Sequence, residues 1–356
     1  MGKKTTTMTI DKSRNELLDF VKAAEIILVV FGHCIQYGSG DNFLNTAAFF
    51  DNPVFIFIYS FHMPLFMLIS GYLFAYSANR RSISENMKKK FFTLIVPIIS
   101  WVALSQIYSI ASNFYHGNSI QLFGIIKAYI SGVVHQFWFL WAIFWSALAV
   151  LVVRKYLRDS VLAYIGIAFI CLFLPNRFNI QMYSFIFPYF VLGYKFNLHQ
   201  AKIDFKKVTK TSVFIWVSIF FFVLLSLFKR SSYIYTSGYY ILNGNMLHQL
   251  LIDFYRFCIG LVGSIFCLLL LEKVYRFVKN TTWSQPILYL GQKTMGIYIV
   301  QGYLISHIMM KITRNFQGVN YGITVIESIA IIILSLLLVY VLQKNTITNR
   351  IFLGGK

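Results

Sequence analysis

The chain has 356 residues, of which 58% are hydrophobic and 12% are charged. Soluble domains carry about 25% charged residues, so this composition excludes an ordinary water-soluble enzyme and indicates a protein embedded in lipid. The formal net charge of +20 would suit a nucleic-acid-binding protein. However, the basic residues are spread over alternate loops rather than gathered on one surface, which excludes that class.

Apolar stretches of about 20 residues, the length that crosses a bilayer, recur along the chain. The fifth and sixth are short, which is typical of a tilted or partly re-entrant pair. The ten stretches are Leu17–Tyr37, Val54–Tyr76, Phe91–Phe114, Phe137–Val153, Val161–Leu174, Met182–Phe196, Thr211–Phe228, Ile252–Leu271, Ile287–His307 and Ile323–Leu342. The sequence therefore predicts an all-α integral membrane protein, a polytopic bundle of about ten transmembrane helices in a single domain over residues 1–356.

The distribution of basic residues predicts the orientation of this bundle. Most of the 32 lysines and arginines lie in the tails, residues 1–16 and 343–356, and in the even-numbered loops. Positive charge marks cytoplasmic loops, so we expect both termini to be cytoplasmic in a multi-pass protein of a bacterial plasma membrane. The 4 cysteines lie within the apolar stretches without metal-ligand spacing, so we expect no metal site.

Lys22 and His33 lie in the first apolar stretch, where a charged side chain costs roughly 2.5–3.5 kcal/mol at the bilayer centre. Eleven helical steps place them within about 20° of one another around the axis and about 16 Å apart along it. The lysine is then near the cytoplasmic end and the histidine near the outer end. Asp19 lies one turn below Lys22 and is expected to pair with it. A lysine that only extends to the interface is the structural alternative for Lys22.

The second stretch carries a further polar set. His62 is predicted at a depth close to that of His33, and Pro64 is expected to kink the helix there. Ser70 and Tyr72 follow near the inner end of the helix.

Polar residues also occur at the ends of later stretches. Trp138 starts the fourth, Asp253 and Arg256 start the eighth, and Lys293 lies in the inner part of the ninth. Structural alternatives exist here too: an interfacial anchor for Trp138 and a structural ion pair for Asp253 and Arg256.

Four segments resemble the membrane acyltransferase-3 family, especially its sugar O-acetylase, fucose 4-O-acetylase-like branch. LLDFVKAAEIILVVFGH resembles the first helix of that family, with a basic residue, ten residues and a histidine. FHMPLFMLISGYLF resembles its second helix, QFWFLWAIF its mid-chain segment and LGQKTMGIYIVQGYLI its penultimate helix. Two positions differ, because arginine is commoner at Lys22 and histidine is frequent at Gln301. Glutamine can form hydrogen bonds but cannot transfer a proton.

The resemblance implies an O-acyltransferase that takes an acyl group, usually acetyl, from cytoplasmic acyl-CoA. The acceptor would be a hydroxyl of an extracytoplasmic glycan or lipid-linked sugar. Acyl-CoA would be a donor substrate, and no cofactor would be bound permanently. The expected roles are catalysis for His33 and His62; donor binding for Lys22, Arg80, Arg81, Lys293, Ser70 and Tyr72; and acceptor binding for Trp138, Asp253 and Arg256.

Several alternatives remain open at this point. His33 acts either as a general base or as a transiently acylated nucleophile. His62 either orients the acceptor or stabilises an oxyanion. A transporter or flippase for a lipid-linked saccharide would also line a polar path with charged residues. A glycan polymerase usually needs a larger outer loop. The sequence leaves the acceptor, the acyl group and the oligomeric state undetermined.

Overall fold

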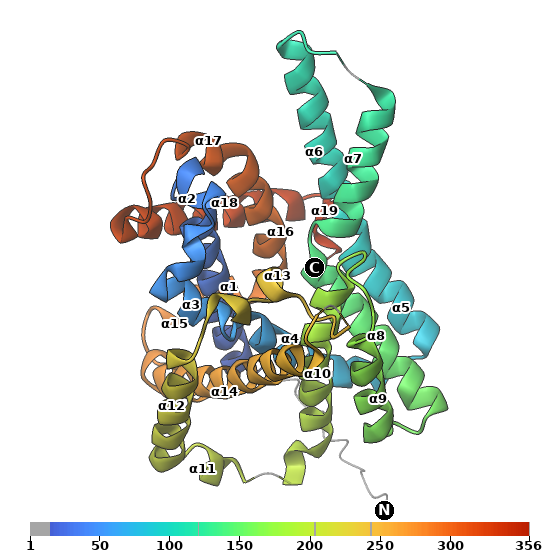
Figure 1. Ribbon diagram of the computed structural model, residues 1–356, viewed down its shortest axis with the longest axis vertical. Helices are drawn as coiled ribbons and strands as arrows, with labels where there is room; N and C mark the ends of the chain where they lie inside the picture. The colour runs from blue at the N-terminus through green and yellow to red at the C-terminus, as the bar shows by residue number, and fades with distance from the viewer. Residues whose placement is uncertain (1–14, 120, 203, 243, 356) are drawn as a thin grey trace, which may run out of the picture.

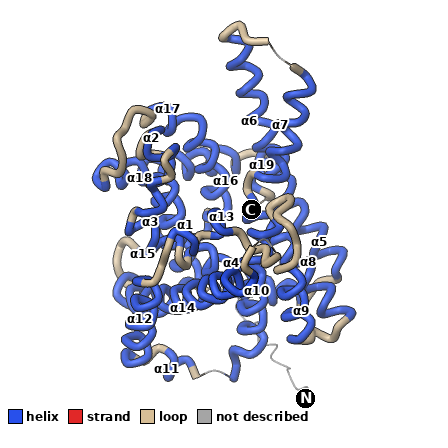
Figure 2. Tube along the Cα trace, in the orientation of Figure 1, coloured by secondary structure: helices blue, strands red, loops and turns tan. Residues whose placement is uncertain are grey.

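The computed structural model describes residues 15–119, 121–202, 204–242 and 244–355, and every regular element in these ranges is helical (Figure 2). The first helices are α1 Glu16–Tyr37, α2 Asp41–Asn45, α3 Pro53–Tyr59, α4 His62–Ala78, α5 Ile83–Lys90, α6 Val96–Tyr115, α7 Leu122–His135, α8 Trp138–Tyr156, α9 Val161–Cys171 and α10 Ile180–His199. They are followed by α11 Phe205–Val208, α12 Thr211–Ser226, α13 Ile234–Ser237, α14 Met246–Val278, α15 Ser284–Gln292, α16 Thr294–Leu304, α17 Met310–Ile312, α18 Tyr321–Gln343 and α19 Thr346–Leu353.

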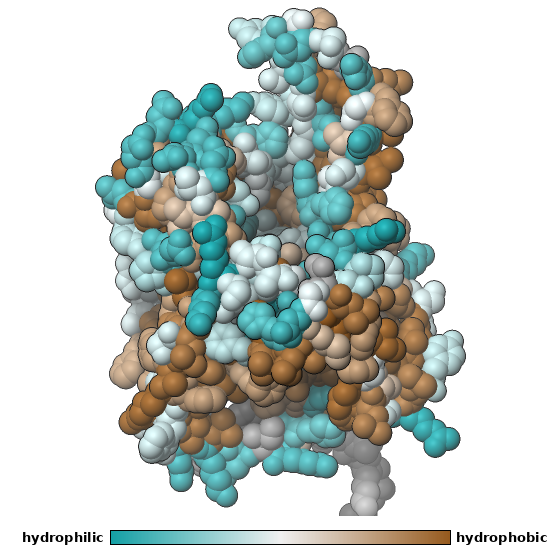
Figure 3. All heavy atoms as spheres, in the orientation of Figure 1, coloured by the Kyte–Doolittle hydropathy of each residue, from teal (hydrophilic) through white to brown (hydrophobic). Residues whose placement is uncertain are grey.

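Each of the ten apolar stretches is largely helical, and within the described ranges five helical segments are long and apolar enough to cross a membrane. These are Pro53–Ala78, Ile83–Tyr115, Trp138–Tyr156, Met246–Val278 and Tyr321–Gln343. Figure 3 shows hydrophobic side chains gathered over the lower half of the molecule, around α12 and α14, with hydrophilic side chains above them around α2 and α17. The prediction of an all-helical, multi-pass membrane protein is confirmed.

The ninth stretch is not one continuous helix, contrary to the prediction. It is divided into α15 and α16 at Lys293, whose φ of −97° and ψ of 5° interrupt the helix. The Thr294 hydroxyl donates to the Gly291 carbonyl at 2.6 Å. A Cβ on Gly291 would collide with the backbone carbonyl of Asp19, so glycine permits α15 to lie directly against α1. Lys293 is therefore at a break between two helices.

Two other segments are more ordered than expected. Residues of the predicted third loop form α7, which pairs with α6 in a hairpin that projects from the body (Figure 1). The predicted C-terminal tail contains α19, and the Trp101 indole donates to the Phe352 carbonyl at 3.0 Å, which fixes α19 against α6. Of the predicted N-terminal tail, residues 1–14 lie outside the described residues.

The second stretch is broken next to Pro64, as predicted. Because proline lacks an N–H and its ring collides with the carbonyl one turn earlier, α3 ends at Tyr59 and α4 begins at His62. Below the break, α4 packs against α10 with backbones in contact. A Cβ on Gly71 would overlap the Phe190 carbonyl, and a Cβ on Gly193 would overlap the Leu68 carbonyl. The close approach holds α4 firmly and thereby fixes the position of His62.

Candidate active site

His33 lies near the C-terminal end of α1 and is half-buried. Its Nδ1 lies 3.1 Å from Oε1 of Gln301 on α16. The amide nitrogen of Gln301 faces the Tyr298 carbonyl at 3.4 Å, an arrangement that directs Oε1 toward the histidine. Since Oε1 only accepts hydrogen bonds, Nδ1 of neutral His33 carries the proton and Nε2 presents a lone pair. The ring is thus prepared to accept a proton at Nε2.

His62 is 3% exposed and starts α4 directly after the helix break. Its Nδ1 lies 2.9 Å from the Ile58 carbonyl, and its ring lies 4.5 Å from the ring of Tyr59. Because a carbonyl accepts, Nδ1 of the neutral ring donates and Nε2 again has the lone pair. A neutral ring in this tautomer does not donate from Nε2, so the geometry favours the predicted orienting role over the stabilisation of an oxyanion.

The two histidines occupy one region of the molecule. The Tyr59 ring, 4.5 Å from that of His62, also lies against Gly32, the residue before His33. The ring of Tyr37 lies 6.0 Å from that of His33. The Tyr59 hydroxyl donates to Oε1 of Gln36 on α1 at 3.4 Å. Tyrosines from α1 and α3 therefore lie beside the two imidazoles.

Lys22 lies at the opposite end of α1 and lines a cavity of about 270 Å³. Its ammonium pairs with Asp19 at 2.6 Å, as expected from their spacing. The predicted Ser70 also lines the cavity, and so does Lys90, which adds a second cation. Tyr298, whose carbonyl contacts Gln301, lines it as well. The cavity thus joins the Lys22 region to the residue that supports the partner of His33.

Arg80 and Arg81 lie in a separate basin of about 610 Å³ at the end of α4. Arg154 and Lys155, from the end of α8, line the same basin, and the Arg154 guanidinium donates to the Ala78 carbonyl. Ser77 lines the cavity of Lys22 and Ala78 lines the basin, so the two sites adjoin along the chain.

Three residues expected in the site have partners elsewhere. The Tyr72 hydroxyl donates to Gln200 at 2.7 Å, and the Lys293 ammonium donates to Gln343 at 2.6 Å. Trp138 packs against the hydrophobic core, with its ring 6.1 Å from Phe139. The predicted donor-binding roles of Tyr72 and Lys293 and the predicted acceptor-binding role of Trp138 stay predictions.

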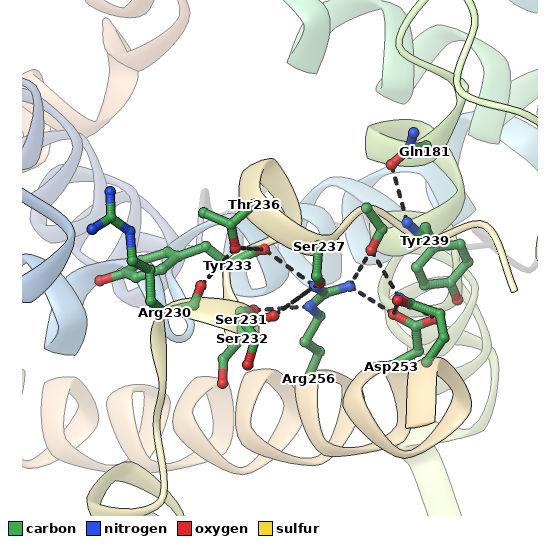
Figure 4. A network of polar contacts seen from close by, with 12 residues as sticks. Gln181, Arg230, Ser231, Ser232, Tyr233, Thr236, Ser237, Tyr239, Asp253 and Arg256 are labelled. Carbon is green, nitrogen blue, oxygen red and sulfur yellow. Dashed lines mark hydrogen bonds and ion pairs between the residues drawn. The ribbon is translucent and has the colours of Figure 1, made fainter. Parts of the chain in front are cut away.

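Asp253 and Arg256 form a buried network at the start of α14 (Figure 4). The guanidinium contacts Asp253 at 2.6 Å, the Ser237 hydroxyl, and backbone carbonyls of the segment before α14. Those carbonyls belong to Ser231, Ser232, Tyr233 and Gly238. All five guanidinium N–H donors are engaged. No guanidinium donor remains for a ligand in this arrangement, which matches the structural ion pair that was the alternative, and the acceptor-binding roles of Asp253 and Arg256 stay predictions.

Sequence reasoning missed the function of Gln301 as the partner of His33 and the presence of Lys90 and Tyr298 in the cavity. Gln301 could have been recognised from the sequence, because it is a polar amide that follows the apolar residues Ile297–Val300. Nothing in the sequence distinguished Lys90, because it belongs to a run of lysines that the preference of basic residues for cytoplasmic loops already explained.

The family model described as an acyltransferase domain, that of the acyltransferase-3 family, matches residues 15–344. Nodulation protein NolL of Mesorhizobium japonicum is 28% identical over 301 residues, which cover 82% of this chain and 76% of that protein. Nodulation protein NolL of Sinorhizobium fredii is 32% identical over 185 residues, 52% of this chain and 49% of that protein. No solved structure matches. The chain therefore belongs to the acyltransferase-3 family and is a multi-pass membrane O-acyltransferase.

Proposed function

We propose that the protein transfers an acetyl group from cytoplasmic acetyl-CoA to a hydroxyl of an extracytoplasmic glycan or lipid-linked sugar. In this proposal residues 1–356 form one domain with ten spans and cytoplasmic termini in a bacterial plasma membrane. The observation that supports it best is the cavity that begins at Lys22 and reaches Tyr298, beside the Gln301–His33 pair. A donor held at one end would place its thioester toward the histidines at the other.

The donor end of this path is positively charged. Lys22 and Lys90 line the cavity, and the adjoining basin adds Arg80, Arg81, Arg154 and Lys155. A CoA nucleotide carries several phosphate charges, and arginine and lysine are the usual phosphate ligands in proteins. The nucleotide would lie in the basin, and the pantetheine arm would follow the cavity. The distance of about 16 Å along α1 matches an extended arm.

The acceptor hydroxyl reacts at His33. Its oxygen attacks the thioester carbonyl while Nε2 of His33 takes its proton. The carbon–sulfur bond then breaks, and the CoA thiolate receives that proton from the imidazolium. Gln301 accepts the Nδ1–H throughout, which keeps the ring in the reactive tautomer and orients it. His62 offers a second Nε2 lone pair, which orients the acceptor hydroxyl.

The test uses purified wild-type protein in detergent with acetyl-CoA labelled in the acetyl group. Loss of label from CoA, with release as acetate or transfer to added glycosides, is expected. A transporter or flippase for a lipid-linked saccharide would leave acetyl-CoA intact, and that result would overturn the proposal. Succinyl-CoA serves as a second donor that tests the preference for acetyl.

A further inference from the structure

We propose that the segment Lys229–Ile241, the acceptor loop, forms one wall of the acceptor site, and that Tyr235 stacks on a sugar ring of the acceptor. This inference rests on the proposed function and adds the residue that recognises the acceptor. The loop joins α12 to α14 and contains only one short turn of 3₁₀ helix and the four-residue helix α13.

The acceptor loop is held from three sides although it has little regular structure. Arg256 of α14 donates to four of its carbonyl groups (Figure 4). The Tyr233 hydroxyl donates to the Phe50 carbonyl at 2.9 Å, ahead of α3. The backbone N–H of Tyr239 donates to Gln181 of α10 at 3.0 Å. Such anchoring gives the loop one defined position relative to the helices that carry the histidines.

Tyr235 lies between these anchors and differs from its neighbour Tyr233. Tyr233 is 3% exposed and packs on Phe50 and Phe55, whereas Tyr235 is 47% exposed. Tyr235 follows Tyr233 by two residues, and the Tyr233 ring lies 6.5 Å from the ring of Tyr59. The loop at Tyr235 is therefore next to the aromatic residue that contacts His62, and part of the Tyr235 surface is open to a ligand.

Two tyrosines lie beside the reacting groups. The Tyr37 ring lies 6.0 Å from His33, and the Tyr59 ring lies 4.5 Å from His62. Aromatic rings offer a flat apolar face, and phenol hydroxyls both donate and accept hydrogen bonds. A sugar presents the matching surfaces, C–H groups on its face and hydroxyls on its rim. A purely apolar acceptor would offer no donor to the Nε2 lone pairs of the two imidazoles, whereas sugar hydroxyls do, so a saccharide is the class of ligand that fits.

The test measures transfer of labelled acetyl from acetyl-CoA to a panel of methyl hexosides and methyl 6-deoxyhexosides, with the glycoside that wild type uses best taken for kinetics. Tyr235→Ala is expected to raise KM for the glycoside about tenfold. KM for acetyl-CoA is expected to stay within twofold. Tyr235→Phe keeps the ring and is expected to restore most of the affinity.

The matched control is Tyr115→Ala, which removes an exposed tyrosine at the tip of the α6–α7 hairpin. It should leave both KM values unchanged. An unchanged glycoside KM in Tyr235→Ala, in protein that elutes as wild type does from a sizing column, would overturn the inference alone. Failure of wild type to consume acetyl-CoA would overturn the proposed function, and the inference with it.

Discussion

The region around His33 and the region around Arg256 both place ionisable side chains in helices of a membrane protein, yet they are partnered in opposite ways. Arg256 uses every donor of its guanidinium on an aspartate, a serine and four carbonyl groups. Among the residues that the structure describes, His33 forms one hydrogen bond, at Nδ1, and is half-buried. A saturated group stabilises the fold, whereas a group with a free lone pair is available for chemistry.

The largest effect is expected when the free Nε2 lone pair of His33 is removed. His33→Ala is expected to lower acetyl transfer by about 10²–10⁴-fold, the contribution of a positioned general base, without loss of folded protein. Purified protein and labelled acetyl-CoA give the rate, and a sizing column reports folding. His116→Ala, at an exposed position beyond α6, is the control and should keep full activity. Normal turnover in His33→Ala would refute the catalytic assignment.

The second test removes the Arg256 guanidinium, whose donors are all hydrogen-bonded. Arg256→Met leaves Asp253 as an uncompensated buried carboxylate and frees the carbonyl groups of the acceptor loop, so we expect a loss of about 3–5 kcal/mol in stability. Thermal denaturation in detergent should show a clear fall in Tm. The double variant with Asp253→Leu removes both charges and should recover part of that loss. A double variant no more stable than Arg256→Met would show that the carbonyl contacts, rather than the ion pair, carry the effect.

A smaller effect is expected at the partner of His33. Gln301→Leu removes the acceptor for Nδ1–H, so the ring loses its fixed tautomer and kcat should fall about tenfold to a hundredfold. Gln301→Glu keeps an acceptor at the same position and should retain more activity than Gln301→Leu. Equal rates in the two variants would argue against the orienting hydrogen bond.

The donor end should respond in KM rather than kcat. Lys22→Met removes one cation from the cavity and is expected to raise KM for acetyl-CoA about tenfold, with little change in kcat. Lys311→Met, at an exposed position beside Tyr108, is a charge-matched control. If both variants shift KM equally, general surface charge rather than a donor contact explains the result.

The smallest effect is expected at Glu25, a buried carboxyl group without a hydrogen bond. Glu25 is fully buried, and neither of its carboxyl oxygens has a hydrogen-bond partner among the described residues. Glu25→Gln should therefore leave acetyl transfer unchanged and keep or raise Tm by a few degrees, since no favourable contact is lost. A marked fall in Tm would reveal that the carboxyl contributes through its attraction to Lys22.

The periodicity and charge of the sequence were sufficient to predict the helical stretches, the Asp19–Lys22 pair and the break next to Pro64, because each depends on local spacing. The Gln301–His33 contact joins residues 268 positions apart, and no local pattern encodes it. Arg256 was recognisable as unusual, but its role depends on carbonyl groups of a loop whose path only tertiary packing determines. The helix α7 was missed because it is shorter than a span.

The length of chain between His33 and Gln301 also has a consequence for biosynthesis. Helix α1 is synthesised first, and α16 is among the last helices to leave the ribosome, so His33 lacks its partner for most of translation. The glycine contacts between α4 and α10 likewise form only after the residues between these two helices have been synthesised. The reactive tautomer is therefore assembled at the end of membrane insertion, and truncated chains that end before Gln301 are expected to be inert toward acetyl-CoA.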